Sequence, residues 1–342
     1  MKKTILLLLL ISPFGIHKGF AQFTDKEQAE LMAKQALIFE DKGNIMGALE
    51  LLHKAEKLDS TNIMYSYEKA FAYNLLKDYK MVKDILEKLV KREDANGKIY
   101  QLLGNTYDNL KDSARSVATY QEGLKRFPNA GELYLEMGNY YVRNKQYKAA
   151  VTQYESGIKA DPMFASNYYW AAKMFLGSNE KVWGLIYGEM FMLLESGSRR
   201  TAEISRMLYL TCKNQISMNP DGTYNVQLAT STIPDSVANR DPLNKKLPFS
   251  KSVYEPLLAL GLQGEKILDI NSLSKARKTF TEYYYNTDIF QNYPNALMDY
   301  QYKLLKAGHI DAYNHWVLAE GNHEDFVKWQ NANKLRYNKF MK

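Results

Sequence analysis

The sequence repeats itself with a period of 34 residues. When Gly104 is aligned with Gly138 the following segments match, and the frame extends to units at 29–62, 63–96, 97–130, 131–164 and 165–198. Position 8 of each unit is small and position 11 is aromatic; these residues are Ala36, Ala70, Gly104, Gly138 and Ala172, and Phe39, Tyr73, Tyr107, Tyr141 and Phe175. Aromatic residues make up 13% of the chain, so five in register do not arise by chance. Such a period is typical of stacked supersecondary units.

Each unit has the pattern of two amphipathic helices joined by a tight turn, as at Lys42-Gly43-Asn44. Small residues recur at positions 8, 20 and 27, where their size lets paired backbones approach closely. The aromatic side chains at positions 11 and 24 are suited to fill the groove between helices. One such hairpin cannot bury its apolar face, so several must stack into a continuous core. We therefore predict an all-α fold in which the residues at positions 8 and 11 pack the repeats together.

This pattern resembles the tetratricopeptide repeat family over residues 29–198, most closely in the two units that end near Pro128 and Pro162. The resemblance implies a right-handed α-solenoid whose concave face is lined by the first helix of each unit and binds peptides. The candidate ligand-binding residues on that face, which we expect to be exposed, are Asn105, Asn109, Asn139, Arg143 and Lys173. They form a neutral-to-basic strip suited to peptide carbonyls or a carboxylate. The alternative is a solvated helix face without a ligand.

Residues 199–342 are predicted to be a helical C-terminal region that follows an array at 22–198. Within it, 216–250 is the least helical stretch, because the turn Asn219-Pro220-Asp221-Gly222 precedes alternating apolar residues. This predicts a short β-hairpin and a long connection that contains Pro234, Pro242 and Pro248. A helical pattern precedes this stretch at 199–215. Further helical patterns come after it at 250–261, 272–286, 294–306 (opening at Pro294), 309–320 and 322–341. The last helix, begun by Asn322, is predicted to cap the array. The alternative is that its basic residues form a docking surface for an acidic partner.

Residues 1–21 have the pattern of a secretory signal. Lys2 and Lys3 precede a short apolar run, and small residues precede a cleavage site after Ala21. The run is too short to span a bilayer, and the first 30 residues contain no cysteine for a lipid anchor. We therefore expect an exported protein without a membrane span, periplasmic or secreted and not a lipoprotein; the alternative is a buried N-terminal helix. Three basic residues lie in the leader, so the formal charge of +7 falls to +4, too small for a nucleic-acid footprint.

Patterns that carry chemistry are weak in this chain. The single cysteine, Cys212, excludes a disulfide framework and is expected to be a small buried residue. His309, His315 and His323 lie in an acidic segment, where Asp311 and His315 share a helix face. Their spacing matches no metal motif, and a surface histidine near acidic groups is the expected outcome. Nucleophile-elbow, phosphate-loop and dinucleotide patterns do not occur. We expect no catalytic residue, metal or cofactor.

These observations favour a non-catalytic, exported protein that binds a protein or peptide partner as a scaffold or adaptor in the cell envelope. One alternative is a binding protein for an envelope glycan, because the chain contains 26 tyrosines that could stack on sugars. The other is an enzyme whose site lies in 199–342.

Overall fold

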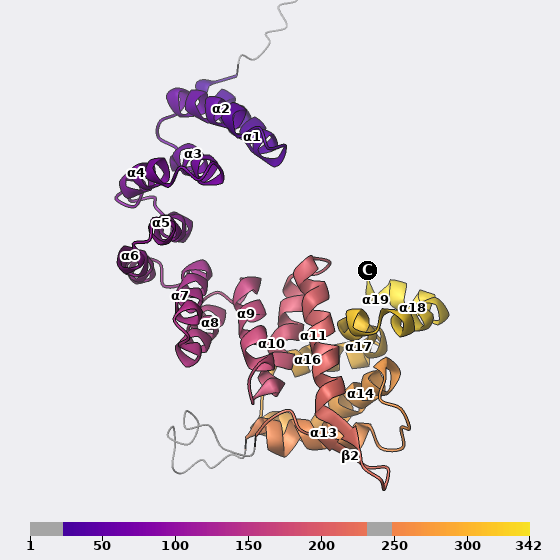
Figure 1. The fold of residues 1–342 in the computed structure, drawn as a ribbon. Helices are drawn as coiled ribbons and strands as arrows, with labels where there is room; N and C mark the ends of the chain where they lie inside the picture. The colour runs from indigo at the N-terminus through magenta and orange to yellow at the C-terminus, as the bar shows by residue number, and fades with distance from the viewer. Residues whose placement is uncertain (1–22, 231–247) are drawn as a thin grey trace, which may run out of the picture. The chain divides into compact units, whose positions relative to one another are not determined.

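A computed structural model describes residues 23–230 and 248–342. The predicted leader at 1–21 lies outside the described residues, as do Pro234 and Pro242. The described chain is built mainly of α-helices, which confirms the predicted all-α fold of helix hairpins (Figure 1). Contacts divide it into two compact units, residues 23–95 with 105–112, and residues 96–104 with 113–342. Among the described residues, no helix combines the length and apolarity that crossing a bilayer requires.

The first unit consists of helix hairpins whose starting points are set by local capping. Thr24 and Glu27 form a reciprocal capping box, and Asn44, Asn62 and Asp78 accept backbone N–H groups at the next three starts. Each helix packs against its neighbour in the chain. The helices are α1 (Asp25–Asp41), α2 (Ile45–Leu58), α3 (Ile63–Leu75) and α4 (Tyr79–Leu89), and the end of α5 (Gly97–Asn109) also belongs to this unit.

The second unit continues the hairpins in the same frame, and α11 adds one more first helix beyond residue 198. Position 8 is buried in all five units. At position 11 only Tyr107 is buried, and the other four aromatic residues are half-buried. The most deeply buried rings come from position 24, where Tyr120 and Tyr154 lie against Gly104 and Gly138. The helices are α6 (Ser113–Arg126), α7 (Gly131–Arg143), α8 (Tyr147–Ala160), α9 (Ala165–Leu176), α10 (Lys181–Leu194) and α11 (Arg199–Gln215).

A left-handed backbone residue recurs at position 15, between the two helices of a repeat unit. Gly43 has φ +78°, and Lys77, Lys111 and Lys145 have φ of 61°, 65° and 58°. A lysine in this conformation costs about 1–2 kcal/mol, whereas glycine adopts it without a Cβ clash. The left-handed turn conformation therefore repeats in these units, although the residue at position 15 is glycine in one unit and lysine in the others.

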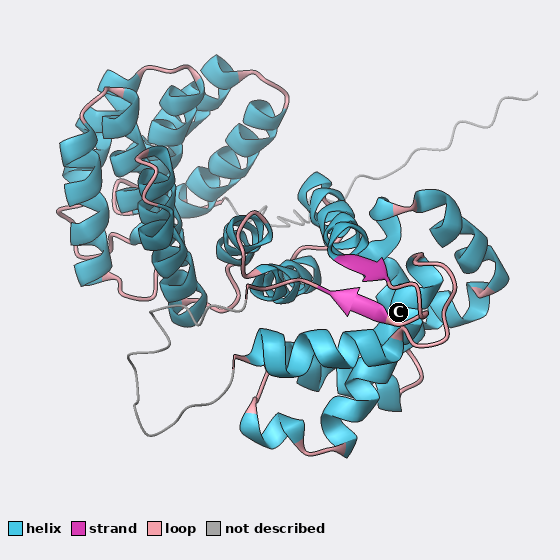
Figure 2. Cartoon of the chain, turned by 60° about the horizontal axis from the view of Figure 1, so that its bottom comes forward, coloured by secondary structure: helices cyan, strands magenta, loops and turns pink. Residues whose placement is uncertain are grey.

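The predicted β-hairpin is present after α11. Strands β1 (Ile216–Met218) and β2 (Tyr224–Val226) pair antiparallel, with Ile216 opposite Val226 (Figure 2). The chain beyond β2 is held by Glu255, whose carboxylate accepts the backbone N–H groups of Leu228 and Ala229 at 2.8 and 2.7 Å. The hairpin is thereby anchored to the helices that follow it.

The C-terminal helices differ from the prediction in two places. Pro294 precedes the cap residue Asn295, so that helix begins at Ala296. The helix predicted over 322–341 is divided at Asn333, whose side chain donates to the carbonyl of Trp329 at 3.0 Å and competes with the helix backbone. The elements are a π-turn (Ser250–Tyr254), α13 (Glu255–Gly261), α14 (Ile270–Asn286), α15 (Ile289–Asn292), α16 (Ala296–Lys306), α17 (Ile310–Leu318), a 3-10 turn (Ala319–Gly321), α18 (His323–Ala332) and α19 (Lys334–Phe340).

One continuous apolar core joins the last repeat helices to the C-terminal helices. It extends from Tyr168 on α9 to Phe326 on α18 and includes residues of α10, α11, α13, α14, α16 and α17. The repeat pattern predicted from the sequence ends at residue 198, but the helices on both sides of that residue pack into the same apolar core.

Candidate binding face

In the second unit, hydrogen bonds join polar side chains of consecutive first helices, and two of the predicted binding residues, Asn139 and Lys173, bond to the acceptors of these networks. Glu136 on α7 accepts a hydrogen bond from Gln101 on α5 at 2.8 Å and one from Asn139 at 3.3 Å. The amide oxygen of Asn139 in turn accepts from the hydroxyl of Tyr154 at 3.0 Å. Asn139 thus holds two helices of its own repeat unit in place.

The same arrangement recurs between α9 and α11. Glu203 accepts hydrogen bonds from the hydroxyl of Tyr169 and the ammonium of Lys173, both at 2.6 Å. The ammonium also lies 5.3 Å from the ring centre of Trp170, a cation–π distance. Burial lowers the pKa of Lys173, but the hydrogen bonds and charges of Glu203 and Tyr169 together outweigh burial, so the pKa is raised. Lys173 is therefore charged and already paired with Glu203.

The expectation that the candidate residues are exposed holds only for two of them. Asn109 and Arg143 are exposed, whereas Asn105, Asn139 and Lys173 are half-buried. The expectation was wrong for those three. Lys173 reaches Glu203 on the next first helix, and Asn139 is bonded to Glu136 on its own helix and to Tyr154 on α8. The acceptors Glu136 and Glu203 were missed. The available signal was an acidic residue 34 or 35 positions after Tyr169 and Gln101.

In the first unit, the equivalent face is apolar. Position 9 carries Leu37 on α1 and Phe71 on α3, whose exposed fractions are 43% and 36%. Position 5 carries Ala33 and Tyr67, both half-buried. Two large apolar side chains at one repeat position differ from the polar strip predicted from Asn105 onwards. We call Leu37 and Phe71 the position-9 pair.

An acidic group lies at the end of α1, at position 12 of the same repeat unit. The Oε1 atom of Glu40 is buried and has no hydrogen-bond partner among the described residues. Burial, together with the charges of Glu68 and Asp41, raises the pKa of Glu40 to about 7. A basic side chain placed beside this carboxyl group would lower its pKa and stabilise its charged form.

Replacing Glu40 with glutamine is expected to stabilise the protein at pH 8 and leave its stability unchanged at pH 4. A carboxyl whose folded pKa exceeds its unfolded pKa favours folding below the unfolded pKa, about 4.5, and that contribution is lost as the pH rises to about 7. Because Glu40 is partly exposed, we expect a gain of about 1 kcal/mol at pH 8. Urea unfolding at both pH values measures it, with the exposed Glu50→Gln as control. An equal gain at both pH values would contradict the stated cause.

A buried charge network lies in the C-terminal part of the second unit. The carboxylate of Glu189 on α10 accepts two hydrogen bonds from the guanidinium of Arg277 on α14, at 2.7 and 2.6 Å. It also accepts from Gln301 on α16 at 2.9 Å and from Tyr313 on α17 at 2.8 Å. Burial lowers the pKa of Arg277, but the charge and hydrogen bonds of Glu189, with smaller effects of Tyr254 and Tyr313, together outweigh burial and raise it. This Glu189 cluster joins four helices and was not predicted.

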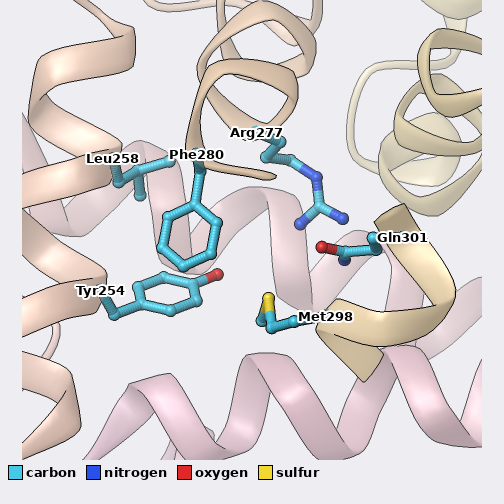
Figure 3. A pocket seen from close by; sticks show the side chains of 6 residues that line it. All are labelled: Tyr254, Leu258, Arg277, Phe280, Met298 and Gln301. Carbon is cyan, nitrogen blue, oxygen red and sulfur yellow. The ribbon is translucent and has the colours of Figure 1, made fainter. Parts of the chain in front are cut away.

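The space beside the Glu189 cluster is too small for a substrate. Arg277 and Gln301 point toward one another across it, and the rings of Tyr254 and Phe280 lie together on the apolar side (Figure 3). The cavity volume is about 10 Å³, at most the room for one water molecule. The nearby thiol of Cys212 is buried, as expected, and burial raises its pKa to about 12. The geometry therefore supports a structural role for the cluster.

The histidine segment is also structural. His315 is buried, which corrects the expected surface position, and its ring stacks on Trp329 at 3.9 Å between ring centres. Its Nδ1 lies 3.3 Å from Asp311, a carboxylate that also accepts from Arg336 at 2.8 Å. His323 is exposed on α18. Among the described residues, no three His, Cys, Asp or Glu side chains converge in a way that could hold a metal ion.

Comparison with known proteins agrees with the repeat frame. The model of the tetratricopeptide repeat family matches residues 97–129 and 131–162, which correspond to helix pairs α5–α6 and α7–α8. These two segments are tetratricopeptide repeats. In the structure, the helix pair α3–α4 precedes these two segments and the helix pair α9–α10 follows them, both in the same 34-residue frame. No curated protein matches the chain.

Several solved structures resemble about half of this chain. YrrB, described as a TPR protein with an unusual peptide-binding site, is 20% identical, with a TM-score of 0.33 over 50% of this chain and 89% of its own. The pilF protein of Pseudomonas aeruginosa is 15% identical, with a TM-score of 0.45 over 56% and 85%. PilW, a type IV pilus biogenesis factor, is 15% identical, with a TM-score of 0.43 over 54% and 84%.

Proposed function

We propose that this chain is a non-catalytic scaffold or adaptor that binds a protein or peptide partner through its first-helix face. The observation that carries the proposal is the position-9 pair. Leu37 and Phe71 keep more than a third of their surface exposed at one repeat position, although large apolar side chains are usually buried. An apolar partner segment would cover that surface.

The chemistry beside the position-9 pair narrows the class of partner. Glu40 lies one helical turn after Leu37 and contains a buried carboxyl oxygen without a partner among the described residues. A basic side chain on the partner would satisfy that oxygen and favour the charged form of Glu40. We infer that the preferred segment contains apolar residues and a lysine or arginine.

The candidate polar residues have two different roles in this proposal. Asn109 and Arg143 are exposed and can contact a partner directly. Lys173 joins α9 to α11 through Glu203, and Asn139 joins α7 to α8 through Tyr154. Asn105 is half-buried and is assigned to the ligand-binding strip from its repeat position. No nucleic acid, metal or cofactor enters the proposal.

The proposed location is the cell envelope. The leader pattern of residues 1–21 supports export and cleavage after Ala21, which leaves a periplasmic or secreted chain. A scaffold in that compartment meets partners of the envelope.

A peptide library displayed on phage tests the binding proposal. Selection on the intact protein is expected to enrich segments that combine apolar residues with lysine or arginine. For an enriched peptide, replacing both Leu37 and Phe71 with alanine should weaken binding at least about tenfold, because truncated apolar anchors usually dominate such contacts. The control is Leu335→Ala, which removes a still more exposed apolar side chain, 82% exposed, from α19. Equal binding to both variants would place the site elsewhere.

A further inference from the structure

Helix α1 differs from later first helices in what covers position 3 of its repeat unit. Where a second helix precedes, as α2 precedes α3, it packs on the next first helix and buries this position. Tyr65 on α3, Leu133 on α7 and Asn167 on α9 are all buried there. In α1 the same position is Leu31, and 48% of its surface is exposed. Among the described residues, no helix precedes α1.

Position 10 shows a smaller difference in the same direction. Ala72 on α3 and Leu208 on α11 are buried and the residues at this position on α7 and α9 are half-buried, whereas Ile38 on α1 is 50% exposed. Leu31 and Ile38 are seven residues apart, so they lie on one side of the helix two turns from each other. Exposed polar residues complete this side of the helix, which we call the α1 stacking face: Glu27, Lys34, Gln35 and Lys42. It is a surface of the kind that the array elsewhere covers with a helix.

We propose that the α1 stacking face binds the same face of a second copy of this chain in an antiparallel, two-fold symmetric pair. In such a pair each contact occurs twice, so a patch must be complementary to itself. With the two-fold axis beside Lys34 and Gln35, Leu31 meets the partner's Ile38. The same register brings Glu27 opposite the partner's Lys42. Apolar residues thus meet at the centre, and opposite charges meet at both ends.

The charge pattern distinguishes this arrangement from a parallel pair. A parallel pair would place Glu27 beside the partner's Glu27 and Lys42 beside the partner's Lys42, which is repulsive at both ends. Antiparallel packing also opposes the two helix dipoles. One helix from each subunit is a small interface, so we expect a dissociation constant in the micromolar range. The face is separate from the position-9 pair, so dimer formation and peptide binding can fail independently.

Sedimentation velocity of the purified protein, processed as cells process it, tests the proposal between about 1 and 200 µM. We expect a concentration-dependent dimer. Ile38→Glu should weaken it about a hundredfold or more, because a carboxylate is then buried without a partner. Met46→Glu, which changes an exposed residue of α2, should leave it unchanged. Unfolding curves should show that both variants fold. A wild-type monomer throughout, or an undiminished dimer of Ile38→Glu, would overturn the proposal.

Cysteine cross-linking tests the register. The only native thiol, Cys212, is buried and should not interfere. Leu31→Cys and Ile38→Cys proteins, mixed under mild oxidation, are expected to form a disulfide-linked dimer of one of each. Each variant alone should cross-link much less, since like positions lie about two turns apart in an antiparallel pair. Equal cross-linking of Leu31→Cys alone would overturn the antiparallel register.

Discussion

Replacing Glu189 with alanine is expected to lower the free energy of unfolding by about 3–5 kcal/mol. The substitution leaves the guanidinium of Arg277 buried without its countercharge, and it removes the acceptor for Gln301 and Tyr313. A buried charge without a partner costs far more than the intact pair contributes. The loss should be measured by denaturant unfolding followed by circular dichroism.

Two controls separate this effect from the general loss of an ion pair. Glu324→Ala breaks the exposed pair with Lys328 and should change the free energy of unfolding far less than Glu189→Ala, because solvent screens that pair. Changing Glu189 and Arg277 together to methionine should recover a large part of the loss, because no charge is then left buried. If Glu189→Ala and Glu324→Ala cost the same, the Glu189 cluster contributes nothing beyond a surface pair.

Tyr154→Ala is expected to cost about 3–5 kcal/mol, because it empties the space that the ring fills against Gly138 in the repeat core. The same change removes the hydroxyl that donates to Asn139. Tyr154→Phe should cost only about 1 kcal/mol, which separates the hydrogen bond from the ring. Thermal unfolding of the three proteins provides the measurement.

Tyr147 offers a matched control on the same helix. It lies on α8, seven residues before Tyr154, but more than half of its surface is exposed. Tyr147→Ala should therefore change the free energy of unfolding by no more than about 0.5 kcal/mol. If Tyr147→Ala and Tyr154→Ala are equally harmful, the frame that assigns position 24 to the core is wrong.

Helix α1 carries two exposed apolar surfaces, and we propose a different binding role for each. Leu37 belongs to the first-helix face that we propose for partner binding, whereas Leu31 and Ile38 belong to the α1 stacking face. Leu37 lies about 120° around the helix from Leu31, so one ligand helix does not cover both surfaces. A dimer through one surface would leave the other available, and would present two binding faces to one partner.

The features that repeat every 34 residues could be derived from the sequence alone. Position 8 is small in every unit, and at Gly104 and Gly138 the ring from position 24 of the same hairpin fills the space beside it, so the requirement is local to each hairpin. The β-hairpin also follows from local signals, since the turn at 219–222 and the alternation after it lie within a dozen residues. Local sequence patterns are sufficient where the stabilising contacts are close in the chain.

Only the tertiary structure decided which polar residues are engaged and which apolar residues are exposed. Glu189 and Arg277 are 88 residues apart, and no periodic signal connects them. Lys173 was expected to face a ligand, but it binds Glu203 on the next first helix. Leu31 occupies the same repeat position as the buried Leu133, and its exposure depends on the absence of a preceding helix among the described residues. Burial and pairing are properties of what packs against a residue, and that neighbour is chosen by the fold rather than by the residue's own sequence context.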